Sequence, residues 1–108
     1  MLRLRASADF QVVWKKGKRV SVSQLTLVSC ENQLGHPRLG ISIPKKHVRS
    51  SVHRNRLKRL ARETFRVRQE TLGSRDIVLL AYKGAEALTA QEQYQRFNAL
   101  WDLFVQKS

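Results

Sequence analysis

Residues 53–66 read HRNRLKRLARETFR, a stretch with six Lys or Arg residues and a single acid, Glu63. At about 100° per residue on an α-helix, the side chains sort by chemistry. One side collects the residues suited to a core, which are His53, Leu57, Leu60, Ala61, Thr64 and Phe65. The opposite side collects a cationic stripe of Asn55, Lys58, Arg59, Arg62 and Arg66. The pattern predicts a long helix with one packed face and one cationic face.

The residues around this helix predict its ends and the strand that follows it. Ser50 or Ser51 can cap the N-terminus, and the helix is expected to reach about Gln69 before the turn at 73–74. Residues 76–82, DIVLLAY, are too continuously apolar for a half-exposed strand. They predict a central strand that is covered on much of both faces.

The C-terminal part of the chain has the pattern of a core helix. Thr89 and Glu92 have the spacing of a capping box. Large apolar residues then recur at helical spacing, namely Tyr94, Phe97, Leu100, Trp101 and Phe104. We therefore expect a helix with a wide apolar stripe.

The N-terminal part predicts a short helix. Ser7 can cap it, and Phe10, Val13 and Trp14 fall at positions i, i+3 and i+4 before Gly17. This spacing is typical of an amphipathic helix.

Two extended segments are expected between the short helix and the long one. Residues 20–30, VSVSQLTLVSC, alternate small polar with β-branched or aliphatic residues, with a kink expected near Gln24. Turn residues then lead into RLGISI at 38–43, which Pro44 closes. A β-hairpin between the two segments is the expected connection.

The predicted order is helix, strand, strand, helix, strand, helix, with no repeat, low-complexity tract or linker. A chain of 108 residues forms one small domain. We therefore expect residues 1–108 to form a single α+β domain, an α/β sandwich with a small mixed sheet.

The charge of the chain points to a polyanionic partner. There are 21 Lys and Arg residues against 8 Asp and Glu, which leaves a net charge of +13. Residues 45–68 hold ten of these cations and one acid, whereas residues 76–108 hold three cations and four acids. Such a local excess favours binding to a polyanion.

Cysteine usage and hydropathy indicate the compartment. The single cysteine, Cys30, excludes an intramolecular disulfide and fits a reducing environment. The first ten residues lack the apolar run of a signal peptide, and no segment approaches the roughly 18 apolar residues of a membrane span. We expect a cytoplasmic protein without a membrane partner.

The basic helix repels itself unless an anion binds. Lys58/Arg62 and Arg62/Arg66 are i,i+4 like-charge pairs, each unfavourable by about 0.2–0.5 kcal/mol. Arg54 and Arg56 lie near the helix N-terminus, where free N–H groups favour an anion over a cation. A solvated face is the alternative, but solvated faces usually interleave both signs. A nucleic acid is therefore favoured over an anionic membrane surface.

Two further basic clusters could extend this surface. Lys45, Lys46 and Arg49 precede the basic helix. Another cluster follows the first helix and consists of Lys15, Lys16, Lys18 and Arg19.

Four blocks of the sequence resemble the bacterial ribonuclease P protein component family. RNR at 54–56, followed by LKRLARETFR, resembles the family's signature helix, and LGISIPKK at 39–46 resembles the strand before it. DFQVVWKKG at 9–17 and DIVLLAYKG at 76–84 resemble its N-terminal helix and last strand. The resemblance spans nearly the whole chain.

The resemblance implies a protein that binds a large catalytic RNA and helps it remove the 5′ leader of precursor tRNA. Hydrolysis then belongs to the RNA and its Mg²⁺, so no side chain is catalytic and the protein itself binds no metal or cofactor. A monomer in a 1:1 complex with the RNA is implied, with no DNA partner. The family also implies a left-handed crossover around the signature helix, where general rules predict a right-handed one.

The family's binding residues carry over by position. The catalytic RNA would be contacted by Arg54, Asn55, Arg56, Lys58, Arg59, Arg62, Arg66, Lys45, Lys46 and Arg49. The single-stranded leader would lie in a cleft lined by Phe10, Trp14, Lys15 and an exposed sheet face with Thr26 and Val28. Aromatic rings beside cations suit such a strand, because bases stack without sequence demand. For Phe10 and Trp14 a core position is an equally open interpretation.

Other functions have weaker support. His36, His47 and His53 have no carboxylate at a spacing that suggests a catalytic dyad, and Cys30 has no nearby cation or histidine in sequence. A ribosomal or other structural RNA-binding protein fits the charge equally well. A helix-turn-helix DNA reader fits less well, because a buried strand follows the basic helix and no short helix directly precedes it.

Overall fold

The computed structural model describes residues 13–107, so the predicted cap Ser7 and the ring of Phe10 lie outside the described part of the chain. Residues 13–16 are helical and lead into the sheet through Gly17. The elements that follow are β1 (Lys18–Val22), β2 (Leu25–Glu31), β3 (Arg38–Ser42), α2 (Ser51–Arg66), α3 (Gln69–Leu72), β4 (Arg75–Ala81), the 3-10 helix η1 (Ala85–Ala87) and α4 (Ala90–Lys107). The α+β class is as predicted.

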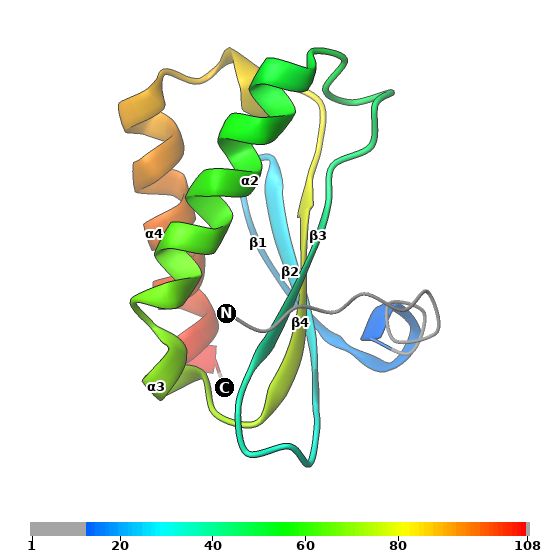
Figure 1. Ribbon diagram of the computed structural model, residues 1–108, viewed down its shortest axis with the longest axis vertical. Coiled ribbons are helices and arrows are strands. Elements are labelled where there is room, and N and C mark those ends of the chain that lie inside the picture. Colours follow the sequence, from blue (N-terminus) through cyan, green and yellow to red (C-terminus); the bar gives the residue numbers. More distant parts are fainter. Residues whose placement is uncertain (1–12, 108) are drawn as a thin grey trace.

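Four strands form one mixed sheet in the order β1-β2-β4-β3 (Figure 1). β4 lies between β2, to which it is antiparallel, and β3, to which it is parallel. Every residue of β4 after Arg75 is buried. These observations confirm the prediction of a central apolar strand at this place. The ladders on both edges also satisfy its backbone polar groups.

Two predictions for residues 20–43 are wrong. The expected kinked segment is a hairpin, in which Lys18 of β1 faces Ser29 and Val22 faces Leu25 of β2. Ser23 has φ +55° in the turn, a left-handed conformation typical of tight hairpin loops. β2 and β3 form no hairpin, because β4 lies between them. β4 takes this central place because a continuously apolar strand is buried best in the middle of a sheet, where apolar layers cover both of its faces.

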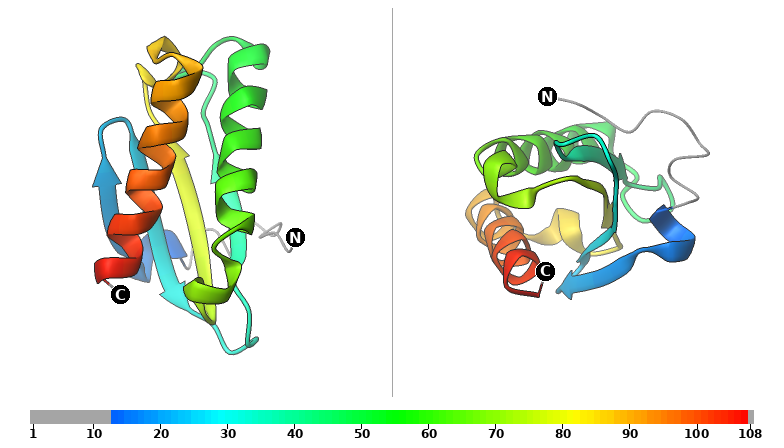
Figure 2. Two further views of the ribbon diagram at one scale, coloured as in Figure 1. Left: turned by 90° about the vertical axis from the view of Figure 1, so that its left-hand side faces the viewer. Right: turned by 90° about the horizontal axis from the view of Figure 1, so that it is seen from below.

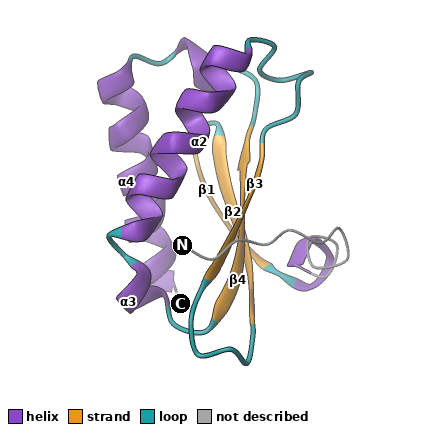
Figure 3. Cartoon of the chain, viewed as in Figure 1, coloured by secondary structure: helices purple, strands orange, loops and turns teal. Residues whose placement is uncertain are grey.

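The sheet separates two apolar layers. α2 and α4 lie together on one face, and the helical residues 13–16 lie on the other (Figures 1 and 3). The main core fills the space between the sheet and the two long helices and includes Phe65, Phe97 and Trp101. A smaller cluster on the opposite face contains Val13 and Val28. β3 reaches its parallel neighbour β4 through α2, so the predicted βαβ crossover is present; its left-handed sense stays a prediction.

The ends of α2 follow local signals. Ser50 is the N-cap, and its hydroxyl accepts a hydrogen bond from the His53 backbone N–H at 3.4 Å. The helix ends at Arg66, earlier than the predicted Gln69, because the backbone N–H of Arg68 bonds to the Phe65 carbonyl at 2.9 Å in a tighter turn. The short helix α3 then leads through a turn to β4.

The start of α4 has the predicted capping box. Glu92 N–H donates to the Thr89 hydroxyl at 3.1 Å, and Thr89 N–H donates to the Glu92 carboxylate at 2.9 Å. Tyr94 is 52% exposed, so its predicted core position is wrong. The neighbouring Gln93 takes the inward position, where its amide donates to the Ala85 carbonyl at 3.1 Å.

The two long helices are joined by a buried hydrogen bond as well as by apolar contact. The indole N–H of Trp101 donates to the Thr64 hydroxyl at 2.8 Å. Phe97, Leu100 and Phe104 are buried as predicted. Within residues 13–107, no helix is long and apolar enough to cross a lipid bilayer.

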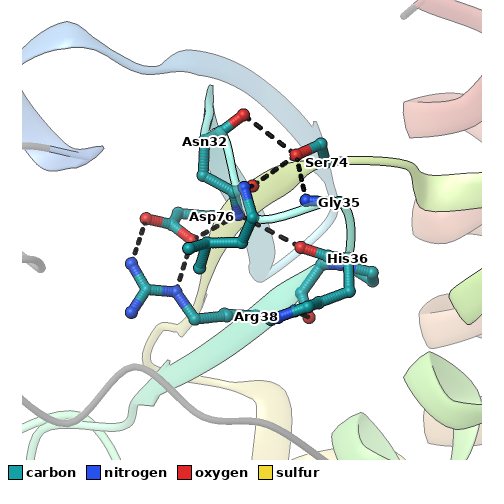
Figure 4. A network of polar contacts seen from close by, with 8 residues as sticks. Asn32, Gly35, His36, Arg38, Ser74 and Asp76 are labelled. Atoms are coloured by element: carbon teal, nitrogen blue, oxygen red, sulfur yellow. Dashed lines mark hydrogen bonds and ion pairs between the residues drawn. The ribbon is translucent and has the colours of Figure 1, made fainter.

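A polar network closes the end of the sheet where β2 ends and β4 begins (Figure 4). Arg38 donates to both carboxylate oxygens of Asp76, at 2.8 and 2.7 Å, and the Asn32 amide donates to one of them at 2.8 Å. The Ser74 hydroxyl donates to the Asn32 carbonyl at 2.9 Å and accepts from the Gly35 N–H at 3.0 Å. These bonds hold the β2–β3 connection against the start of β4.

Candidate nucleic-acid interface

The cationic stripe lies on the face of α2 that points away from the core. Leu57, Ala61, Thr64 and Phe65 are buried, which confirms the predicted packing face. The residues on the opposite side remain accessible, with Asn55, Arg59 and Arg66 exposed and Lys58 and Arg62 partly buried. The division read from helical periodicity is therefore present in the fold.

Few acids neutralise the charge of this stripe. Between side chains of residues 13–107 the ion pairs are Arg38–Asp76 and Arg68–Asp102, and neither involves Arg59 or Arg66. Glu63 lies four residues after Arg59, a spacing at which opposite charges attract on a helix, but it forms no ion pair in this part of the chain. The exposed guanidinium groups are thus available to an external anion.

The segment between β3 and α2 adds cations at the N-terminus of the helix. Val48 is buried and anchors this segment to the core. Arg54 donates to the carbonyls of Val48 and Arg49, at 2.9 and 2.7 Å. Arg54 therefore holds the segment in place, a role that was not predicted from the sequence, because no local pattern indicates which carbonyl groups lie near this side chain. Exposed cations at this end are Lys45, Lys46, Arg49 and Arg56.

Trp14 and Lys15 lie on the other side of the sheet, among the helical residues 13–16 (Figure 1). Val13 is fully buried against the sheet, whereas Trp14 is 43% exposed, and Lys15 is exposed. The guanidinium carbon of Arg19 lies 4.1 Å from the centroid of the Trp14 ring. Between the two interpretations left open for Trp14, the structure favours the surface. It also places Arg19 beside the ring, a member of the basic cluster at 15–19 that was not predicted to contact the leader.

Thr26 and Val28 do not lie on an exposed sheet face, and this prediction is wrong. Their exposed fractions are 6% and 0%. Val28 packs against Val13, and the Thr26 hydroxyl shares a hydrogen bond of 2.9 Å with Ser21. The end of the short helix approaches β2 so closely that a Cβ at Gly17 would lie 2.6 Å from Val28 Cγ1. This approach covers the part of the sheet that was expected to be open.

The histidines take part in local contacts. The His47 ring packs edge-on against Tyr82 with centroids 5.7 Å apart, and His36 Nδ1 lies 3.4 Å from the Pro37 carbonyl oxygen. Within residues 13–107, no three His, Cys, Asp or Glu side chains gather as a candidate metal site. The contacts of both rings agree with the structural roles expected for them.

The fold and its charged surfaces define a class: small α+β proteins that present a cationic helix to a polyanion. The sequence model of the family Ribonuclease P matches residues 1–104. The ribonuclease P protein components of Vibrio campbellii and Yersinia enterocolitica are 41% and 42% identical over 100 residues, which cover 93% of this chain and 85% and 84% of theirs. The chain belongs to the ribonuclease P protein family.

Solved structures agree with this assignment. The Staphylococcus aureus RNase P protein matches with a TM-score of 0.88 at 32% identity, covering 96% of this chain and 95% of that one. The RNase P protein from Thermotoga maritima, solved in complex with 1-(4-fluorophenyl)-2-thiourea, matches with a TM-score of 0.79 at 29% identity, covering 91% and 96%. The same α+β architecture therefore extends across these relatives.

Proposed function

We propose that the cationic face of α2, with the segment before it, binds the catalytic RNA of ribonuclease P, and that the Trp14 surface binds the 5′ leader of precursor tRNA. Family membership makes the chain the protein subunit of this ribonucleoprotein endoribonuclease, which removes the leader to form the mature tRNA 5′ end. Its partners are the ribonuclease P RNA and precursor tRNA. The alternative of a ribosomal or other structural RNA-binding protein is rejected.

The observation that carries the proposal is the pair of exposed arginines, Arg59 and Arg66, on the cationic stripe of α2. Exposed Arg59 and Arg66 form no ion pair within residues 13–107, on a helix whose other face is committed to the core. Guanidinium groups suit bidentate contacts with phosphate oxygens. The proposed RNA contacts are Asn55, Arg56, Lys58, Arg59, Arg62, Arg66, Lys45, Lys46 and Arg49, together with the N–H groups of Arg54 that do not hold the preceding segment.

The proposed leader surface differs from the one expected from the sequence. Trp14 is 43% exposed and lies next to Arg19 and Lys15, so a base can stack at this ring while a cation meets its phosphate. Val28 and Thr26 are buried and therefore do not touch the strand. Phe10 stays a predicted leader contact outside the described residues.

The protein's contribution is to binding, and we assign hydrolysis to the RNA and its Mg²⁺. A leader is present on the precursor and absent from the product, so contacts at Trp14 favour substrate over product. We further propose one protein monomer per catalytic RNA, acting in the cytoplasm.

A cleavage assay tests this function directly. Precursor tRNA is incubated at low Mg²⁺ with the catalytic RNA, with and without the protein. We expect the protein to accelerate leader removal, because its cations replace part of the charge screening that Mg²⁺ supplies. The protein alone should leave the precursor intact. If the protein does not accelerate cleavage, the subunit role is rejected. If the protein alone cleaves the precursor, the protein is itself a nuclease.

Trp14→Ala tests the leader surface. The variant holoenzyme should bind precursor tRNA about 5- to 100-fold more weakly, as expected for the loss of one base stack. Binding of mature tRNA should stay unchanged, because it has no leader. An equal loss for both RNAs would show that Trp14 acts only through the fold.

A further inference from the structure

A basic pocket lies at the end of the molecule opposite the N-terminus of α2. Its volume is about 580 Å³, and it is bounded by the start of β1, the end of β2 and the last turns of α4. Figure 2 shows the C-terminus of α4 beside these strand ends. Five cations line it, namely Lys16, Lys18, Arg19, Arg75 and Lys107, against one acid, Glu31.

Within residues 13–107, no ion pair balances the charge of the pocket cations. Neither ion pair between side chains of residues 13–107 uses any of its five cations. Glu31 faces Arg75 in the β2–β4 ladder, yet no ion pair joins them in this part of the chain. Cations that surround one concavity repel one another and focus a positive potential into it. Anionic ligands are therefore the chemistry that this pocket fits.

Two of the five cations are held in place by aromatic rings. Arg19 lies over the Trp14 ring, and the guanidinium carbon of Arg75 lies 5.3 Å from the centroid of the Phe104 ring. The network of Figure 4 fixes the strand ends below them, since Asn32 N–H also donates to the Ser74 carbonyl at 3.0 Å. Preorganised donors lose less entropy when an anion binds.

We propose that this pocket binds the phosphates of single-stranded RNA, namely the upstream part of the precursor leader after it has passed Trp14. This inference rests on the proposed leader binding and adds a second contact region to it. Arg19 belongs to both regions, because it stacks on Trp14 and lines the pocket, so the two surfaces are continuous. A strand held at Trp14 is thus led directly to the pocket.

The size and lining of the pocket favour a single strand of any sequence. A pocket of this volume admits a nucleotide unit, whereas a rigid duplex meets only its rim. Its aromatic residue, Phe104, is buried and offers no free face for stacking. Contacts to phosphates carry no sequence information. Leader length, and not leader sequence, should therefore control the contact.

The test measures affinity as a function of leader length. The holoenzyme is assembled with wild-type protein or with Lys18→Ala combined with Lys107→Ala, two exposed residues of the pocket rim. Precursors differ only in whether the leader ends near the Trp14 surface or continues well beyond it. The variant should bind the long-leader precursor about tenfold more weakly at about 0.1 M salt, as two lost phosphate contacts imply. Its affinity for the short-leader precursor should equal that of the wild type.

A matched control separates the pocket from general charge. Lys83→Ala combined with Arg96→Ala removes two exposed cations outside the pocket. This variant should retain the wild-type difference between long and short leaders. If the pocket variant binds both precursors more weakly by the same factor, the pocket contacts the catalytic RNA or the tRNA body instead, and the proposal is overturned. An unchanged affinity for both would overturn it as well.

Cys30 provides a second measurement on the unaltered protein. It is the single cysteine of the chain and lines the pocket, so its alkylation rate reports whether the pocket is occupied. Burial, and next the nearby Asp76 carboxylate, raises the pKa of the Cys30 thiol, so the reaction is followed at mildly alkaline pH. The long-leader precursor should slow alkylation in the holoenzyme and the short-leader precursor should not. Equal rates with both would contradict the proposal.

Controls with the wild-type holoenzyme distinguish a failure of the pocket assignment from a failure of the proposed leader binding. The proposal that the protein binds the leader is wrong if the wild-type holoenzyme does not bind precursor tRNA more tightly than mature tRNA. If that preference holds and the pocket variant keeps the full effect of leader length, only the pocket assignment fails.

Discussion

Asp76 stands at the start of the central strand, where a charged group needs local compensation. Burial favours the protonated form and would raise its pKa, but hydrogen bonds from Arg38 and Asn32 outweigh this effect and hold the pKa of Asp76 below its usual range. The three residues come from β4, β3 and the β2–β3 connection. One carboxylate therefore joins the start of β4 to a stretch of chain that lies 38 to 44 residues earlier.

The lowered pKa predicts how acid affects stability. A carboxylate whose pKa is lower in the folded state stabilises the fold above about pH 4 and loses this contribution as the pH falls through the folded-state value. Asp76→Asn should reduce the free energy of unfolding at pH 7 by about 1–3 kcal/mol, and this difference should shrink below about pH 4. Urea unfolding at pH 7, 5 and 3 measures both effects.

A second acid of the chain serves as the control for this prediction. Asp102 pairs with Arg68 at 3.2 Å but its side chain is 66% exposed. Asp102→Asn should change stability by about 1 kcal/mol or less. A pH-independent effect of Asp76→Asn would show that the charge of Asp76 is not what stabilises this end of the sheet.

At the scale of one element, α2 satisfies two different requirements with its two faces. Its buried face holds the βαβ crossover together through Leu57, Ala61 and Phe65. Its cationic face works against helix stability, because Arg62 and Arg66 are like charges one turn apart. A helix selected for stability alone would place acids among these residues, and the proposed RNA binding explains why this face lacks them.

Arg59→Ala combined with Arg66→Ala tests this division. The salt dependence of catalytic-RNA binding, plotted as log Kd against log salt concentration, should flatten by about 0.7–0.9 for each lost phosphate contact. Stability should stay equal or rise slightly, because about 0.2–0.5 kcal/mol of repulsion disappears. Filter binding over a salt series, with urea unfolding in parallel, measures both quantities. An unchanged slope together with a loss of stability would assign these residues to the fold.

At the scale of the whole molecule, a net charge of +13 is spread over dimensions of 37 × 26 × 22 Å. Cations concentrate on α2 and its preceding segment, on residues 15–19, and at the pocket between β1 and α4. The elements that carry these cations lie on both sides of the sheet and toward both of its ends (Figure 1). The free protein thus carries cationic side chains that repel one another. The phosphates of a bound RNA would reduce this repulsion.

This arrangement predicts that salt stabilises the free protein. Raising NaCl from about 0.05 to 0.5 M shortens the Debye length from more than 10 Å to less than 8 Å and weakens the repulsion. Tm should therefore rise with salt, and the rise should be smaller for Arg59→Ala with Arg66→Ala. Thermal unfolding followed by circular dichroism measures it. A Tm that falls with added salt would mean that attractive ion pairs dominate.

Features that depend on neighbours along the chain could be predicted from the amino-acid sequence. Helical periodicity predicts the two faces of residues 53–66, and an unbroken apolar run predicts the buried strand at 76–82. Hydrogen bonds within one turn predict the Thr89–Glu92 capping box and limit the cap of the basic helix to Ser50 or Ser51, of which the structure has Ser50. The charge distribution follows directly from composition. Together these features were sufficient for the resemblance to the ribonuclease P proteins.

Only the tertiary structure decided which residues distant in the chain come into contact. Strand order could not be predicted, because the pairing of β4 with both β2 and β3 depends on competition among strands for the same edges. The burial of Val28 depends on how closely the short helix lies on the sheet, and the pocket depends on where the last turn of α4 meets the start of β1. Local patterns determine what each element can bury or expose, whereas long-range packing determines which of the exposed residues share a surface.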